Sequence, residues 1–174
     1  MKKAFAAAVA ALAIIVSFTA CGSSGSAETN LTGSTATILE NVLNAAAANV
    51  GVTELAEVTA EDAQSTLGLS AADFDKYVAE ATVSRALMMT SAHEVTLVKV
   101  KDGASVADLK AAIAAGFDST KWICVVPDKS VVIDSGSYVL LVVSYSDTVD
   151  AILKAFKDAA GTVGSENVFY TRPV

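Results

Sequence analysis

The stretch VVIDSGSYVLLVVS, residues 131–144, contains two apolar runs separated by a short polar segment with one glycine. Residues 131–133 and 138–144 are rich in Val, Ile and Tyr, which favour strands, and residues 134–137 have the composition of a tight turn. The sequence therefore predicts a β-hairpin. Its two strands are expected to be antiparallel, because the link between them is too short for a crossover.

An amphipathic segment with the spacing of an α-helix lies on each side of this hairpin. The segment after it begins at Asp147, which we expect to cap the helix. The segment before it begins with Ser105 and Asp108, a capping-box arrangement. Apolar residues at intervals of three and four predict one buried stripe per helix: Val149, Ile152, Leu153 and Phe156 in the later one, and Val106, Leu109, Ile113 and Phe117 in the earlier one.

Two more strands are predicted upstream of these helices. Apolar and polar residues alternate over residues 79–89, a pattern typical of a strand with one face in water. Arg85 falls on the apolar face of this alternation, so we expect either an opening to water at that end or an acidic partner for Arg85. Residues 95–101 predict the next strand, which ends at an Asp-Gly turn.

The predicted order after residue 77 is strand, strand, helix, strand, strand, helix, which corresponds to ββαββα. We expect an α+β fold, a two-layer sandwich with a four-stranded, mainly antiparallel sheet and helices on one face. Extra N-terminal helices are expected over residues 34–49 and, in shorter form, within residues 52–77. The sequence leaves open whether residues 163–174 add an edge strand or lie along the surface.

The N-terminus has the layout of a cleaved secretory signal. Two lysines precede an apolar run over residues 4–16, and small residues at positions 19 and 20 lead to Cys21. The junction Phe18-Thr19-Ala20-Cys21 resembles a bacterial lipobox, in which a peptidase cuts before the cysteine and diacylglycerol is attached to it. We expect lipid on Cys21 to hold the protein at the extracytoplasmic face of the cell membrane. A retained transmembrane anchor is the alternative, but the apolar run is shorter than the roughly 20 residues of a span.

Three parts of the chain follow from this pattern. Residues 1–20 are the predicted signal peptide, residues 21–33 the lipidated cysteine with a flexible tether, and residues 34–174 a single α+β domain. The tether is rich in Gly, Ser and Thr and has a reach of roughly 20 Å. Signal removal leaves 10 basic against 19 acidic side chains. We expect no nucleic-acid partner, because binding to phosphates depends on an excess of Lys and Arg.

Few residues qualify as candidates for chemistry or binding. His93 is the only histidine and lacks the second histidine of a zinc-binding helix, so we expect no metal site and no cofactor. Cys124 is the only cysteine besides Cys21, and its apolar surroundings predict a buried structural thiol in preference to a reactive one. Trp122 with an exposed Met88 would offer an adaptable binding surface, but gap filling in the core is the favoured interpretation of these side chains.

Three segments resemble a known family: ALMMTSAHEV at residues 86–95, LVKVKD at residues 97–102 and SYVLLVV at residues 137–143. They are similar to the small bacterial lipoproteins called domain of unknown function 4358, over about residues 70–158. The resemblance implies a lipobox, a short tether and one α+β domain. It implies no activity, no cofactor and no site residue.

Two classes of function remain. We favour a binding or scaffolding module of the cell envelope, whose partner is an envelope protein or cell-wall component and whose candidate binding residues are His93 and Trp122. The alternative is an envelope enzyme with an acid or thiol site, for which Cys124, His93 and Asp134 are the candidates. A solute receptor for an importer is disfavoured, because so short a chain rarely forms the two lobes that close around a ligand.

Overall fold

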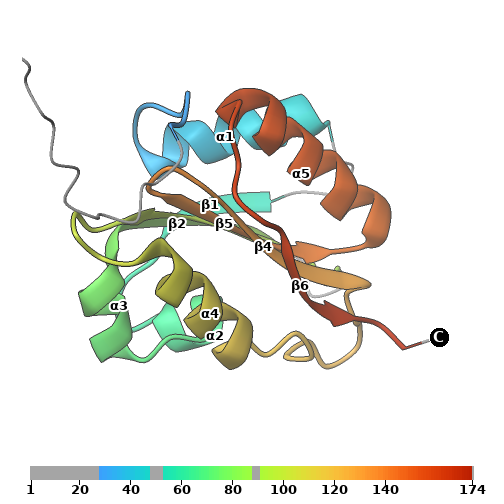
Figure 1. Ribbon diagram of the computed structural model, residues 1–174. Helices are drawn as coiled ribbons and strands as arrows, with labels where there is room; N and C mark the ends of the chain where they lie inside the picture. Colours follow the sequence, from blue (N-terminus) through green and yellow to red (C-terminus); the bar gives the residue numbers. More distant parts are fainter. Residues whose placement is uncertain (1–27, 48–52, 88–90, 174) are drawn as a thin grey trace, which may run out of the picture.

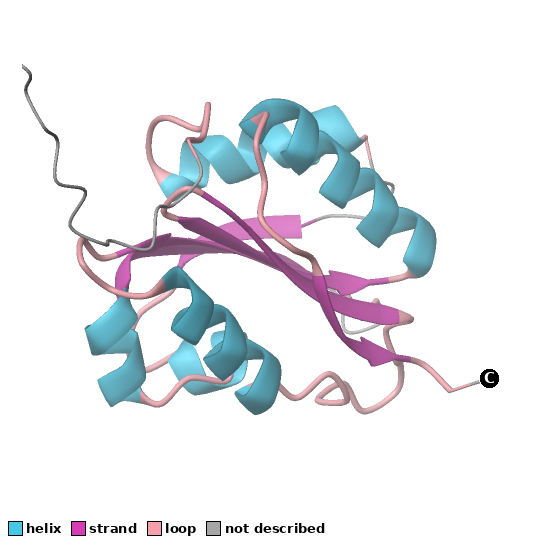
Figure 2. Cartoon of the chain, viewed as in Figure 1, coloured by secondary structure: helices cyan, strands magenta, loops and turns pink. Residues whose placement is uncertain are grey.

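The computed structural model describes residues 28–47, 53–87 and 91–173, in which a six-stranded antiparallel sheet lies between two layers of helices (Figures 1 and 2). The strand order across the sheet is β1-β2-β3-β5-β4-β6. The elements are α1 (Thr35–Ala46), β1 (Thr53–Glu57), α2 (Ala63–Leu67), α3 (Ala71–Tyr77), β2 (Val78–Ala86), β3 (Glu94–Val100), α4 (Val106–Gly116), β4 (Lys129–Ser135), β5 (Tyr138–Ser144), α5 (Ser146–Ala160) and β6 (Asn167–Thr171).

The sheet is packed on both faces, because its strands send alternate side chains to opposite sides. Leu140 and Val142 of β5 belong to the core under α1 and α5, whereas Val139 and Leu141 belong to the core under the layer of α2, α3 and α4. All seven residues of β5 are buried. This double coverage explains why the Tyr138–Ser144 stretch is apolar throughout.

The α+β class and the antiparallel sheet are confirmed, but the expected four strands and single helical layer are wrong. Strand β1 extends the sheet on the side of β2, and β6 extends it on the side of β4. The order ββαββα is present inside this larger sheet, as β2-β3-α4-β4-β5-α5. The second layer arises because α1 packs with α5 on one face while α4 packs on the other.

The prediction that one face of the strand over residues 79–89 meets water is also wrong, because α1 covers that face. Thr82 and Ser84 are buried. The Oγ1 atoms of Thr82 and Thr35 lie 2.7 Å apart, and the Glu80 carboxylate accepts hydrogen bonds of 2.9 Å from the Thr35 N–H and hydroxyl. Polar residues on this face are therefore compatible with burial, because the first turn of α1 supplies donors. Met88 and Met89 lie outside the described residues.

The start of the described chain is packed against the domain. Leu31 is buried in the core under α1 and α5, and the Asn30 N–H donates to the Ala160 carbonyl over 3.0 Å. The Ser135 hydroxyl donates to Thr29 Oγ1 over 2.7 Å, and the Tyr138 hydroxyl donates to the Gly33 carbonyl over 3.1 Å. Packing therefore begins N-terminal to the expected boundary at residue 34.

Sequence signals at turns and caps correspond closely to the structure. The hairpin β4–β5 is present, with Gly136 at a φ of 57° in its turn. Ser105 caps α4 by accepting from the Asp108 N–H over 3.1 Å. Asp147 lies inside the first turn of α5, whose N-cap is Tyr145, so the expected cap at Asp147 is displaced by two residues. Among the described residues, no helix combines the length and hydrophobicity of a membrane span.

Candidate functional site

His93 lies directly before β3, with its imidazole buried on the side of the sheet covered by α1 and α5. Its side chain is 1 % exposed, and Nδ1 lies 3.1 Å from the hydroxyl of Ser144. Nε2 has no hydrogen-bond partner among the described residues. Burial lowers the pKa of His93 to about 4, so the ring is neutral at pH 7. A buried neutral imidazole is not available as a surface contact.

The neighbouring residue, Glu94, points to the opposite side of the sheet and is buried with a cation. Both carboxylate oxygens of Glu94 lie 2.9 Å from Nζ of Lys121, which also donates to the Ser65 carbonyl over 2.6 Å. Burial raises the pKa of Glu94, and the positive charges of Lys121 and Arg85 counteract part of that rise. The structure thus holds a carboxylate and an ammonium together at the start of β3.

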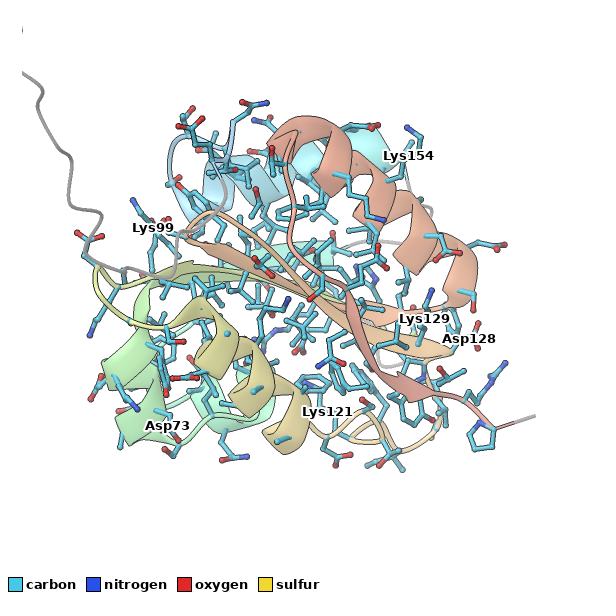
Figure 3. All side chains as sticks on the ribbon, in the orientation of Figure 1. Asp73, Lys99, Lys121, Asp128, Lys129 and Lys154 are labelled. Atoms are coloured by element: carbon cyan, nitrogen blue, oxygen red, sulfur yellow. The ribbon has the colours of Figure 1, made fainter. Side chains whose placement is uncertain are left out.

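Two aromatic rings complete the surroundings of this ammonium. Nζ of Lys121 lies 4.6 Å from the centroid of Phe117 and 5.0 Å from the centroid of Trp122, both within the range of cation–π attraction. The Lys121 ammonium is thus surrounded by Glu94, Phe117 and Trp122. Figure 3 shows Lys121 on the side of the sheet that carries α4, and Lys154 on the side that carries α5.

Arg85 lies directly opposite Glu94 on the adjacent strand β2. The sequence leaves open whether this residue meets water or an acidic partner. In the structure Arg85 has part of each environment, partial exposure to water and a nearby carboxylate. Arg85 is half-buried, its charge acts on Glu94, and its guanidinium donates to Thr66 Oγ1 over 3.3 Å. No described atom accepts a hydrogen bond from its buried Nε. Arg85 is therefore a second positive charge beside the buried carboxylate.

Cys124 is exposed, which overturns the expectation of a buried structural thiol. The apolar run over residues 122–126 lies outside any strand, since β4 begins only at Lys129. Pro127, which cannot donate a hydrogen bond to a sheet, directly follows the run. It is a loop in which Trp122 is half-buried, Ile123 is 88 % exposed and Val126 is 37 % exposed. Short apolar runs do not by themselves distinguish a core strand from such a loop.

Asp134 serves a structural contact and is separated from the other candidates for catalysis. Its carboxylate accepts from Lys110 of α4 over 2.5 Å, and the same ammonium donates to the Ser165 carbonyl over 2.6 Å. Asp134 and His93 project to opposite faces of the sheet, and Cys124 lies in an exposed loop. The structure does not bring Cys124, His93 and Asp134 together as a thiol, base and acid.

His93 and Trp122, the two predicted binding residues, lie on opposite sides of the start of β3. Trp122 packs at the margin of the core under α2, α3 and α4. Within residues 28–47, 53–87 and 91–173, no group of three or more His, Cys, Asp or Glu side chains is arranged to hold a metal ion. Cys21, the expected lipidation site, lies outside the described residues.

The pairing of Glu94 with Lys121 is not predicted by the sequence. One signal was available, because alternation along residues 94–100 places Glu94 on the same face as the buried Val98 and Val100. A carboxylate on a core-facing position requires a cation. The identity of that cation depends on the path of the loop after α4, which residue spacing does not provide.

Comparisons with protein-family models, curated proteins and solved structures gave no match to this chain. Membership of the lipoprotein family named above therefore stays a prediction.

Proposed function

We propose that the protein is an extracytoplasmic lipoprotein, tethered to the cell membrane by lipid on Cys21, that acts as a binding module of the cell envelope. The observation that carries the binding role is the loop over residues 123–126, ICVV. It is a run of four apolar residues, none of which is buried. Consecutive exposed apolar residues are unfavourable in water unless a partner covers them, so they point to a contact surface.

This loop is held at both ends. On one side, Lys121 is bonded to Glu94 and to the Ser65 carbonyl. On the other side, the Arg172 guanidinium pairs with the Asp128 carboxylate over 2.8 Å, and the Arg172 N–H donates to the Asp128 carbonyl over 2.8 Å. Fixed ends lower the entropy lost when a loop is immobilised by a partner, which favours binding.

The loop and the predicted tether lie at opposite ends of the sheet. Residues 29–33 contact the β4–β5 hairpin, whereas residues 123–126 precede the other end of β4 (Figure 1). Strand β4 has seven residues and so separates the two ends by about 20 Å. A tether attached near the hairpin therefore favours presentation of the loop away from the membrane, toward an envelope protein or a cell-wall component.

A crosslinking experiment tests the binding role. Cys21 is expected to be acylated, so Cys124 would be the sole free thiol and an attachment point for a photocrosslinker in native membranes. The matched control is Cys124→Ser with Thr32→Cys, which places the crosslinker at the end of the sheet near the tether. We expect one defined partner from Cys124, greatly reduced by Ile123→Ser. Equal recovery of the same neighbours from both positions would contradict the proposal.

The lipid anchor has a separate test. Intact-mass analysis of the membrane fraction should find a chain that begins at Cys21 and carries diacylglycerol. Cys21→Ala should release the protein from the membrane. Detection of peptides from residues 1–20 in the mature protein would show a retained anchor instead.

A further inference from the structure

The ammonium of Lys121 is surrounded by a complete set of partners for a primary amine. It has three N–H donors, and three acceptors lie at 2.6–2.9 Å: the Ser65 carbonyl and both oxygens of Glu94. The rings of Phe117 and Trp122 add cation–π contacts. A carboxylate combined with aromatic rings is the chemistry by which proteins recognise alkylammonium groups.

We propose that Ser65, Glu94, Phe117 and Trp122 form a binding site for a primary alkylammonium group, which Lys121 occupies in the free protein and which an external amine or a partner's lysine side chain enters by displacing Lys121. The site adjoins the loop over residues 123–126, since Lys121 anchors one end of that loop, so displacement of Lys121 frees that end. Amine binding at this site does not require a partner on the loop.

The positions of receptor and occupant favour exchange. Glu94 belongs to the central strand β3, and Phe117 follows directly on α4. Lys121, in contrast, lies outside any helix or strand, and its side chain is 25 % exposed. The pair of Lys110 and Asp134 differs in both respects, because Lys110 lies within α4 and its side chain is 10 % exposed. The backbone at Lys121 can therefore shift as the side chain leaves without disruption of a helix or strand, whereas the backbone at Lys110 is held within α4.

The charges near the site restrict the ligand to a cation with N–H groups. Glu94 is buried, so departure of Lys121 without a replacement would leave its carboxylate facing only Arg85, which donates to Thr66. A quaternary ammonium has the charge but no donor for the Ser65 carbonyl. The net charge of the chain, −7, also attracts cations toward the surface. The ligand class is therefore a primary alkylammonium.

The experiment uses n-butylammonium, whose four-carbon stem matches that of lysine, and follows the emission of Trp122, the single tryptophan of the chain. In Lys121→Ala we expect saturable binding. In the wild type we expect binding about tenfold weaker or more, because the attached lysine competes at a high effective concentration. Tetramethylammonium should produce neither response.

Two variants serve as matched controls. Glu94→Gln combined with Lys121→Ala should abolish the response, and Lys110→Ala should bind no better than the wild type. A folded Lys121→Ala that does not respond to n-butylammonium would overturn the proposal, as would equal responses to the two amines. If Lys121→Ala does not fold, the wild-type titration decides: saturation by n-butylammonium alone supports an exchangeable site, and no response refutes it.

Discussion

The buried imidazole of His93 makes the stability of the protein depend on pH. Burial lowers the pKa of His93 to about 4 in the folded state, whereas an exposed histidine titrates near 6.5. Between these values the unfolded chain binds a proton that the folded chain does not, so stability is lost as the pH falls. With these two pKa values, the contribution of His93 to the free energy of unfolding decreases by about 2 kcal/mol from about pH 7 to about pH 5.

The comparison that isolates this effect is with His93→Asn, whose amide does not titrate. Urea unfolding followed by Trp122 emission gives the free energy of unfolding at each pH. We expect the wild type to lose about 2 kcal/mol more than His93→Asn over that range. Ser144→Ala is the control and should keep the pH dependence of the wild type, because desolvation and not the Ser144 contact lowers the pKa. Equal pH dependence in wild type and His93→Asn would refute the reasoning.

Two further predictions concern packing. Phe156→Ala, at a fully buried position of α5, should lower the free energy of unfolding by about 4 kcal/mol in urea titrations, whereas Lys154→Ala, which removes an exposed ion pair with Asp158, should change it by about 0.5 kcal/mol or less. Gly68→Ala should lower the free energy of unfolding by at least about 2 kcal/mol, because φ is +70° and an added Cβ would lie 2.2 Å from the Gly116 backbone. Gly103→Ala, where φ is positive but the space is open, should lower it clearly less. Equal losses in the two variants would contradict this steric explanation.

The central elements were predictable because several local signals agree on each of them. The β4–β5 hairpin combines β-branched residues with a glycine-containing turn, and α4 combines a capping serine with an apolar stripe. Strand β1 was missed because Thr53–Glu57, TELAE, carries two glutamates and only moderate β propensity. It forms at the edge through pairing with β2, which is a tertiary contact that its own residues do not encode.

The second helical layer was missed for a different reason. Thr82 and Ser84 alternate with apolar residues as a water-facing set would, and their burial depends on α1, which lies more than thirty residues upstream. A polar residue that finds a hydrogen-bond partner is as compatible with burial as an apolar one. Binary patterning therefore underestimates coverage wherever the covering helix brings polar groups of its own.

His93 and Glu94, adjacent residues at the start of β3, reach burial by different means. No charged group of the described residues contributes to the shift at His93, and desolvation alone lowers its pKa, so the imidazole is buried in its neutral form. Glu94 is accompanied by two cations, Lys121 and Arg85, yet its pKa is still raised because desolvation is the larger effect.

The two residues thus act on the pH dependence of stability with opposite sign. The contribution of His93 is lost as the pH falls below its unfolded pKa, and that of Glu94 is lost as the pH rises through its folded pKa. A pH profile of the wild type alone would combine the two, so only variants that alter one side of β3 at a time can separate the neutral imidazole from the ammonium site on the other side.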